Sequence, residues 1–189
     1  MINEDEFEQL KKDVRVLKDI EAIRELKYRY LNCVDTGDMA GLRALLHDDL
    51  TTDFAGGHFE VELRGADRFI EFIGKTLHSR FIAIHLGHHP RIDIIGEHEA
   101  LGSWYLWDDD MDLTTATRIF GTALYEDRYV RVDGRWLIRH TGYRRVFHAH
   151  ERLGPMDVTV HMLSQTGYRH SPESIPVPLG LPPGKIEPA

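Results

Sequence analysis

Two ionisable side chains occupy strand positions where the alternation of apolar residues predicts a buried face. In residues 81–85 (FIAIH), this alternation places His85 on the apolar face of the strand. In residues 104–108 (WYLWD), it places Asp108 on the face of its apolar neighbours. A buried ionisable group is costly unless it is paired, so both positions predict a polar cavity within the core.

Further candidates lie on the first helix and on the last strand. Tyr30 occupies the apolar stripe of the predicted N-terminal helix, and Asp35 falls in the last turn of that helix. Tyr143 and Arg145 share a strand face if no bulge intervenes at Gly142. A histidine with a carboxylate and a tyrosine nearby is suited to general acid–base chemistry.

Each candidate also has an ordinary structural explanation. His85 can be a hydrogen-bonded core histidine, Asp35 a helix-end residue and Tyr30 a helix core residue. Asp108 can begin a solvated acidic loop over residues 108–110. The group of candidates is more informative than any one of its members.

Known cofactor-binding and nucleophile motifs are missing. The sequence has no P-loop, dinucleotide-binding, nucleophile-elbow or zinc-protease motif. His88 and His89 are adjacent, and strand neighbours point to opposite faces, so their spacing does not suit a metal. Cys33 is the single cysteine, which excludes a disulfide within the chain and a cysteine-rich zinc site. We therefore expect a reaction that needs neither a metal nor an organic cofactor.

Composition limits the partners. The 189 residues are 42% hydrophobic and carry a formal net charge of −8. This acidic balance argues against a nucleic-acid-binding surface, which concentrates Lys and Arg. No secretory signal is visible, and no run approaches the roughly 20 apolar residues that span a membrane. We expect a soluble cytoplasmic protein that contacts neither nucleic acid nor membrane.

The order of periodicities predicts an α+β fold. We expect helix over the first 37 residues, with a break near Lys18 where Asp19 resembles an N-cap. The change from helical to strand periodicity favours α+β over parallel α/β. The other predicted elements are helices at 39–46 and 65–78, a hairpin at 50–55 and 58–63, and strands at 81–86, 91–95, 100–108, 114–132 and 135–148, the last two joined by the Asp133-Gly134 turn.

The proline distribution predicts the domain organisation. We expect one domain over residues 1–150 and a C-terminal extension over 151–189. The extension becomes proline-rich from residue 171, which predicts an extended tail without its own core.

Four segments resemble SnoaL-like proteins of the nuclear-transport-factor-2-like (cystatin-like cone) superfamily, and within it the bile acid 7-alpha-dehydratase group. They are DIEAIRELKYRYLNCVD at 19–35, IHLGHHPRIDI at 84–94, WYLWD at 104–108 and TGYRR at 141–145. The resemblance covers roughly residues 15–150. It implies a cone-shaped, curved antiparallel sheet packed around N-terminal helices, with a pocket at the wide end. It also implies a homo-oligomer, with a trimer favoured over a dimer.

The resemblance assigns roles to the candidate residues. It implies that Tyr30, Asp35, His85 and Asp108 are catalytic and that Arg145 lies in the same site. We add Phe54, Trp104 and Tyr143 to Arg145 as predicted substrate-binding residues. Phe54 stands where the dehydratase group has a pocket tyrosine, so one hydroxyl donor of that group is missing here.

These residues predict proton abstraction. Asp35 would fix the tautomer of His85, and His85 would take a proton from a carbon next to a conjugated carbonyl. Tyr30 would donate a hydrogen bond to the developing enolate oxygen or to the departing hydroxyl. Asp108 would protonate the leaving group if apolar neighbours keep it neutral, whereas Arg145 would make it structural by holding it ionised.

The expected activity is that of a dehydratase acting on a hydrophobic polycyclic substrate, such as a steroid-like, bile-acid-like or aromatic polyketide molecule. The alternatives are an isomerase or a dehydrohalogenase with the same base, or a non-catalytic module that binds a small ligand. Fold membership alone does not choose among them.

Overall fold

The computed structural model describes residues 2–56 and 59–167 of the chain. Its elements follow the predicted order of helices, a small hairpin, a helix and long strands. They are α1 (Glu4–Thr36), α2 (Met39–Arg43), β1 (Leu46–Ala55), β2 (Glu60–Arg64), α3 (Ala66–Thr76), β3 (Phe81–Ile82), β4 (His85–Ile94), β5 (Glu99–Asp112), β6 (Thr117–Val132), β7 (Arg135–Arg152) and α4 (Leu163–Thr166).

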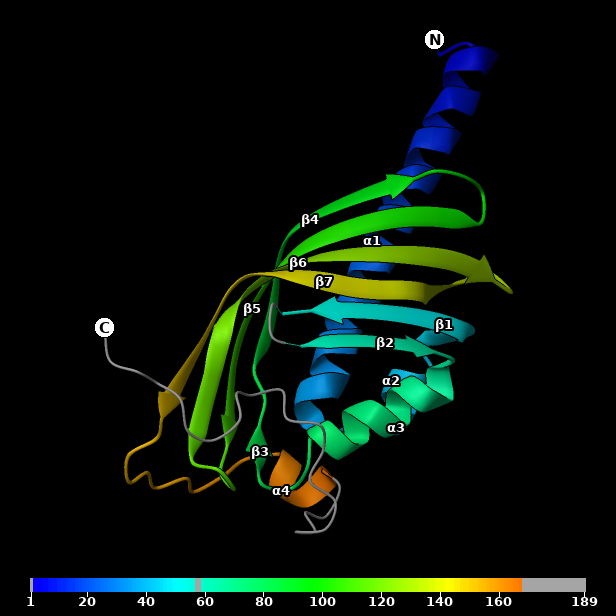
Figure 1. The fold of residues 1–189 in the computed structure, drawn as a ribbon. Coiled ribbons are helices and arrows are strands. Elements are labelled where there is room, and N and C mark those ends of the chain that lie inside the picture. Colours follow the sequence, from blue (N-terminus) through cyan, green and yellow to red (C-terminus); the bar gives the residue numbers. More distant parts are fainter. Residues whose placement is uncertain (1, 57–58, 168–189) are drawn as a thin grey trace.

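A single curled sheet forms the body of the protein. Its strand order is β2-β1-β7-β6-β5-β3, and β4 also pairs with β5. The long strands β5, β6 and β7 bend along their length, so the sheet curls around the C-terminal half of α1 (Figure 1). This arrangement confirms the predicted α+β cone. The sheet is mixed rather than wholly antiparallel, because β7 ends the meander beside β1 and pairs with it in parallel.

Helix α1 is continuous, and the predicted break near Lys18 is wrong. A capping box starts the helix at Asn3, and Gly37 ends it with φ 69°, a left-handed conformation that glycine adopts without strain. Asp19 does not cap a second helix. Its carboxylate instead pairs with Arg131 and accepts a hydrogen bond of 3.2 Å from Trp136 Nε1. A tertiary contact has therefore taken the side chain that resembled a cap.

The second half of α1 supplies the core of the cone. Ile23, Leu26, Tyr30 and Val34 are buried within the sheet. Gly87 on β4 lets the helix approach closely, since a Cβ there would lie 2.8 Å from Leu31 Cδ1. Helices α2 and α3 close the open end of the curl (Figure 1).

The strand predicted over residues 100–108 is longer in the structure, where β5 continues to Asp112. Residues 108–110, which were candidates for a solvated acidic loop, continue β5, and Asp108 and Asp110 are both buried. The turn at Asp133-Gly134 is confirmed, with positive φ at both residues, as a tight hairpin requires.

The described part of the predicted C-terminal extension stays with the domain. Strand β7 continues to Arg152, and Leu163 of α4 is buried near Gly37. The proline-rich segment from 171 to 189 lies outside the described residues. Among the described helices, none is both long enough and apolar enough to cross a membrane.

Candidate active site

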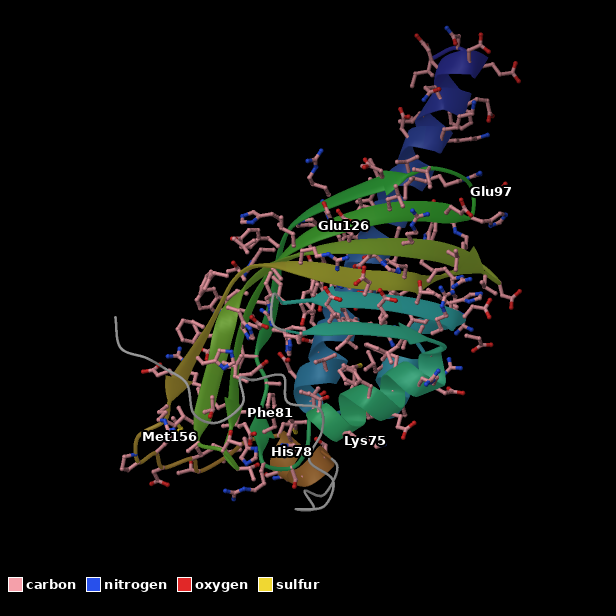
Figure 2. All side chains as sticks on the ribbon, viewed as in Figure 1. Lys75, His78, Phe81, Glu97, Glu126 and Met156 are labelled. Carbon is pink, nitrogen blue, oxygen red and sulfur yellow. The ribbon has the colours of Figure 1, made fainter. Side chains whose placement is uncertain are left out.

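The sheet, α1 and α3 enclose a pocket whose lining is mostly aromatic and aliphatic. Phe81, labelled in Figure 2 on β3, contributes to this lining. His85, Asp108 and Asp110 lie close together in this lining, and Arg145 binds Asp108. Thr76 and His148 are further polar residues of the described lining. The remaining described lining residues are Tyr30, Val34, Phe54, Phe59, Val61, Phe72, Ile73, Leu77, Phe81, Leu106, Ile119, Tyr125 and Tyr143. Such a pocket suits a hydrophobic molecule with one polar end.

His85 and Asp35 form the predicted pair. Asp35 Oδ1 lies 2.7 Å from His85 Nδ1, and Asp35 Oδ2 accepts a hydrogen bond of 3.0 Å from the backbone N–H of His85. Asp35 itself stands behind the histidine, in the last turn of α1. Because Nδ1 faces Asp35, Nε2 is the nitrogen left for a molecule in the pocket.

Asp108 and Arg145 form a second pair. Arg145 Nη1 and Nη2 each donate to one oxygen of Asp108 at 2.6 Å. Asp108 is directly opposite His85 in the β4–β5 ladder, so the two side chains share a face. A bidentate, charge-assisted pair favours the ionised carboxylate. The geometry therefore supports the alternative in which Arg145 holds Asp108 ionised.

Asp110 is a third acid that the sequence analysis did not select. It is buried, and its Oδ1 accepts a hydrogen bond of 3.2 Å from the backbone N–H of Ile84, in the break between β3 and β4. Burial and the neighbouring Asp108 raise the pKa of Asp110 to about 7, although the charge of His85 opposes this shift. Asp110 can therefore carry a proton near neutral pH.

Three carboxylates surround His85 and change its protonation. Burial lowers the pKa of His85, but Asp110, Asp35 and Asp108 together outweigh it and raise this pKa to about 9. A nitrogen of His85 and oxygens of Asp108 and Asp110 lie within 4.8 Å of one another. The site thus holds a histidine and an acid with shifted pKa values close to each other.

The same three residues could in principle supply ligands to a metal ion. Both oxygens of Asp108 already accept hydrogen bonds from Arg145 at 2.6 Å, and a cation there would have to displace this guanidinium. The donor set therefore suits proton transfer better than metal binding, and the expectation of a cofactor-free reaction stays a prediction.

Tyrosines line the wall beside these acids. Tyr30 stacks on Phe69, with ring centroids 6.4 Å apart, and burial together with the charge of Asp127 raises its pKa. Tyr30 therefore remains a neutral hydrogen-bond donor at physiological pH. The predicted residues Phe54 and Tyr143 also line the pocket, and their rings stack with centroids 4.7 Å apart.

Two predicted site residues, Asp35 and Trp104, are not among the described residues that line the pocket, although Asp35 binds His85, which does. Trp104 lies elsewhere in the core, and its Nε1 donates a hydrogen bond of 2.9 Å to the Tyr129 hydroxyl. The Tyr129 hydroxyl donates in turn to Asp127, which lies 2.9 Å from the ammonium of Lys27. Lys27 and Asp127 are both fully buried, so Trp104 belongs to a second polar cluster inside the core.

Other lining residues were also missed, namely Phe59, Tyr125 and His148. Strand alternation could have found Asp110, since it follows Asp108 at a spacing of two. It could not have found His148. A bulge opposite residues 122–123 shifts the parity of β7 after Arg145, and this bulge lies further along than the one considered at Gly142.

With this geometry, comparison with known proteins gives the family. The model of the SnoaL-like domain family matches residues 15–142, and the chain belongs to this family. Its fold is the nuclear-transport-factor-2-like cone.

Three solved structures show the same fold. The hexachlorocyclohexane dehydrochlorinase LinA-type3 of Novosphingobium barchaimii is 19% identical, with a TM-score of 0.64 over 76% of this chain and 99% of its own. A candidate scytalone dehydratase of Novosphingobium aromaticivorans is 22% identical, with a TM-score of 0.61 over 70% and 87%. The Mycobacterium tuberculosis protein Rv3472, of unknown function, is 22% identical, with a TM-score of 0.58 over 69% and 73%.

Proposed function

We propose that this protein is a lyase that removes water from a hydrophobic ring substrate without a cofactor. The observation that carries the proposal is His85, held by Asp35 at 2.7 Å and facing an aromatic pocket beside Asp110. A base oriented by a carboxylate, an acid within reach and an apolar wall are the parts that an elimination needs.

The reaction begins with proton transfer from carbon. Neutral His85 takes the proton through Nε2, and the electrons of the C–H bond form the new carbon–carbon double bond. The negative charge of Asp35 stabilises the imidazolium that results. Tyr30 donates a hydrogen bond to the substrate oxygen on which negative charge develops.

The departing hydroxyl needs a proton to leave as water. We assign this proton to Asp110. The reactive form carries the one shared proton on Asp110 and leaves His85 neutral; it is the minor of the two one-proton forms, because the pKa of His85, about 9, exceeds that of Asp110, about 7. Asp108 was the first candidate for this role, but its two hydrogen bonds from Arg145 make it a poor proton donor. Arg145 and Asp108 then form one rigid polar wall that orients the substrate.

Two alternatives use the same base. An isomerase or a dehydrohalogenase also begins by taking a proton from carbon, and neither needs Asp110 to protonate a leaving group. The names of two similar proteins, a dehydrochlorinase and a candidate scytalone dehydratase, support elimination as the reaction type. A non-catalytic binding module is the remaining alternative.

The proposal extends to the kind of substrate, the location, the oligomeric state and the relatives of this protein. We infer a substrate with a polycyclic apolar body, of the steroid or aromatic polyketide kind, since aromatic rings make up much of the pocket wall. We also propose that the protein is a cytoplasmic homotrimer and that it is related to the bile acid 7-alpha-dehydratase group.

Mass spectrometry after incubation with a steroid-like 7-hydroxy enone separates the alternatives. Loss of water is the expected result, and it must disappear in the His85→Gln variant. An unchanged mass with a shifted absorbance would favour the isomerase. Binding of the enone without any change would contradict an enzyme and favour the binding module.

A further inference from the structure

The first half of α1 is a helical arm that leaves the body of the protein. Residues 4–18, the arm, extend beyond the sheet (Figure 1), and all of them are exposed. The docked part of the helix begins at Asp19, through its contacts with Arg131 and Trp136. The arm is therefore a helix with a fixed base and a free surface among the described residues.

The arm carries an apolar stripe that its own domain does not use. Phe7, Leu10, Val14 and Leu17 are 49%, 49%, 41% and 65% exposed. At 3.6 residues per turn, this stripe lies about 160° around the helix from the stripe in residues 20–34 that packs inside the sheet. Exposed apolar side chains arranged in one line mark a surface that a partner covers.

The body of the protein leaves this stripe accessible. The arm residues nearest to the body are Lys12, Arg15 and Val16, which lie beside the β4–β5 turn at Ile95 and Glu97. Figure 2 labels Glu97 on that turn. These arm residues are on the side of the helix opposite to the stripe, so a second helix can approach without meeting the sheet.

The spacing of the stripe is that of a coiled coil. Successive residues of the stripe are three, four and three residues apart. This heptad spacing places Phe7 and Val14 at heptad position a, and Leu10 and Leu17 at heptad position d. A seam of this kind packs against another helix with the same repeat. The arm of a second copy of this chain has that repeat by definition.

The charges beside the seam select one orientation. The g positions are acidic, Glu6 and Asp13, and the following e positions are basic, Lys11 and Lys18. In a parallel pair, g of one helix faces e of the next heptad on its partner, which gives only opposite charges. In an antiparallel pair, g faces g and e faces e, which gives only like charges.

We propose that the arm packs in parallel against the arm of a second copy of this chain; in the homotrimer proposed above, the third arm would join the same parallel bundle with the same g–e contacts. The present contacts of the arm's charged side chains lie at exposed positions: Glu6 accepts a hydrogen bond of 2.9 Å from the backbone N–H of Asn3, and Asp13 accepts one of 2.8 Å from Gln9. Lys11 pairs with Glu8 at 2.6 Å, but both side chains are more than half exposed, and such surface pairs contribute little. Short isolated helices are marginal in water, whereas this arm continues a helix that the core already holds.

Cysteine cross-linking tests the pairing in the full-length protein. We place a thiol on the seam with Leu17→Cys and, as the matched control, on the opposite face with Lys12→Cys. In a parallel pair the two residues at position 17 are neighbours, which raises their effective concentration toward ~mM. Under mild oxidation the Leu17→Cys chain is expected to form covalent dimers about a hundredfold faster than the Lys12→Cys chain. The unmodified chain, whose Cys33 is buried, reports the background.

Equal cross-linking rates at the two positions would overturn the proposal. They would overturn it in favour of an antiparallel pair, or of another segment of the chain covering the stripe. Oligomeric state alone would be ambiguous, because exposed Leu86, Leu124 and Phe147 on the sheet can also pair copies.

Charge reversal provides an independent test of the orientation. In the Leu17→Cys background, Lys11→Glu with Lys18→Glu makes the arm acidic. Glu6→Gln with Asp13→Lys makes it basic and keeps a capping side chain for the backbone N–H of Asn3. Each variant alone is expected to lose most of its cross-linking, and an equal mixture is expected to recover it as the mixed dimer. A mixture that cross-links no faster than either variant alone would contradict the pairing of g with e.

Discussion

Both carboxylate oxygens of Asp35 bind His85. Oδ1 lies 2.7 Å from the ring Nδ1, and Oδ2 accepts the backbone N–H at 3.0 Å. One residue at the end of α1 therefore fixes both the start of β4 and the orientation of the imidazole. This relationship leaves Nε2 facing the pocket and underlies the predictions below.

Removing either member of this pair should abolish turnover without unfolding the protein. His85→Gln removes the base, and Asp35→Asn removes the charge that stabilises the imidazolium. General base catalysis contributes roughly 10²–10⁴-fold, and we expect a loss of this order in each variant. Product formation gives the rate, and circular dichroism reports the fold.

The control for this experiment is His88→Gln, which changes an exposed histidine on the same strand. This variant should keep the wild-type rate. Wild-type rates in both the His85 and Asp35 variants would show that the pair has no part in the reaction.

The pH dependence of kcat/KM should distinguish dehydration from the other eliminations. Dehydration needs one proton shared between His85 and Asp110, and their pKa values of about 9 and about 7 bound the range in which one proton is present. The rate should rise through pH 7, fall through pH 9 and peak at about pH 8. An isomerase or dehydrohalogenase needs only neutral His85, so its rate should rise through about pH 9 and stay high.

The charge of Asp110 should be visible in the titration of His85. Asp110→Asn removes a negative charge that raises the pKa of the imidazole, so this pKa should fall below about 9. NMR titration of the histidine ring measures it directly. Asp109→Asn is the matched control, because Asp109 lies on the other face of β5 and pairs with Arg118. Equal shifts in the two variants would contradict the placement of Asp110.

Breaking the Asp108–Arg145 pair should destabilise the fold. Arg145→Met leaves Asp108, only 2% exposed, without its counter-ion, and losing one partner of a buried pair costs about 3–5 kcal/mol. Urea denaturation measures the free energy of unfolding. Adding Asp108→Leu should recover most of the loss, since an apolar pair of similar volume is often close to neutral.

Arg144→Met provides the comparison for that experiment. Arg144 precedes Arg145 on β7 and pairs with Asp53 at the surface, with its side chain 61% exposed. Its loss should cost less than about 1 kcal/mol. If the Arg145 and Arg144 variants lost the same stability, Asp108 would not depend on Arg145.

Periodicity predicted much of the site and left a definite part unresolved. Strand alternation placed His85, Asp108 and Arg145 on inward faces, and the structure brings all three to the pocket. It could not pair His85 with Asp35, because contacts between segments fifty residues apart depend on tertiary packing. That pairing came from the family resemblance.

Two residues show what a local pattern lacks. The predicted strand ended at Asp108, with a solvated acidic loop as the alternative for residues 108–110, whereas β5 continues to Asp112 and buries Asp110. Trp104 was correctly placed on the inward face, but alternation selects a face and not a position along the strand. Trp104 packs near Tyr129 in the core, away from the pocket.

The apolar stripe of the first helix also shows this difference. A helix-period pattern predicts a face that will be covered, without indicating what covers it. Residues 20–34 are covered by the sheet of the same chain. Phe7 and Leu17 are exposed in the described structure, so sequence periodicity alone did not separate a core face from an interaction face.

Deuterium loss from carbon tests the central claim most directly. A cyclic enone deuterated at the acidic carbon is incubated with the wild-type and His85→Gln proteins at concentrations where calorimetry shows binding, and its mass is followed. We predict that the wild-type protein removes the deuterium and that the His85→Gln variant does so at least a hundredfold more slowly, of the order expected for a lost general base. If the enone bound to the wild-type protein kept its deuterium, or if both proteins removed it at the same rate, proton abstraction by His85 would be contradicted.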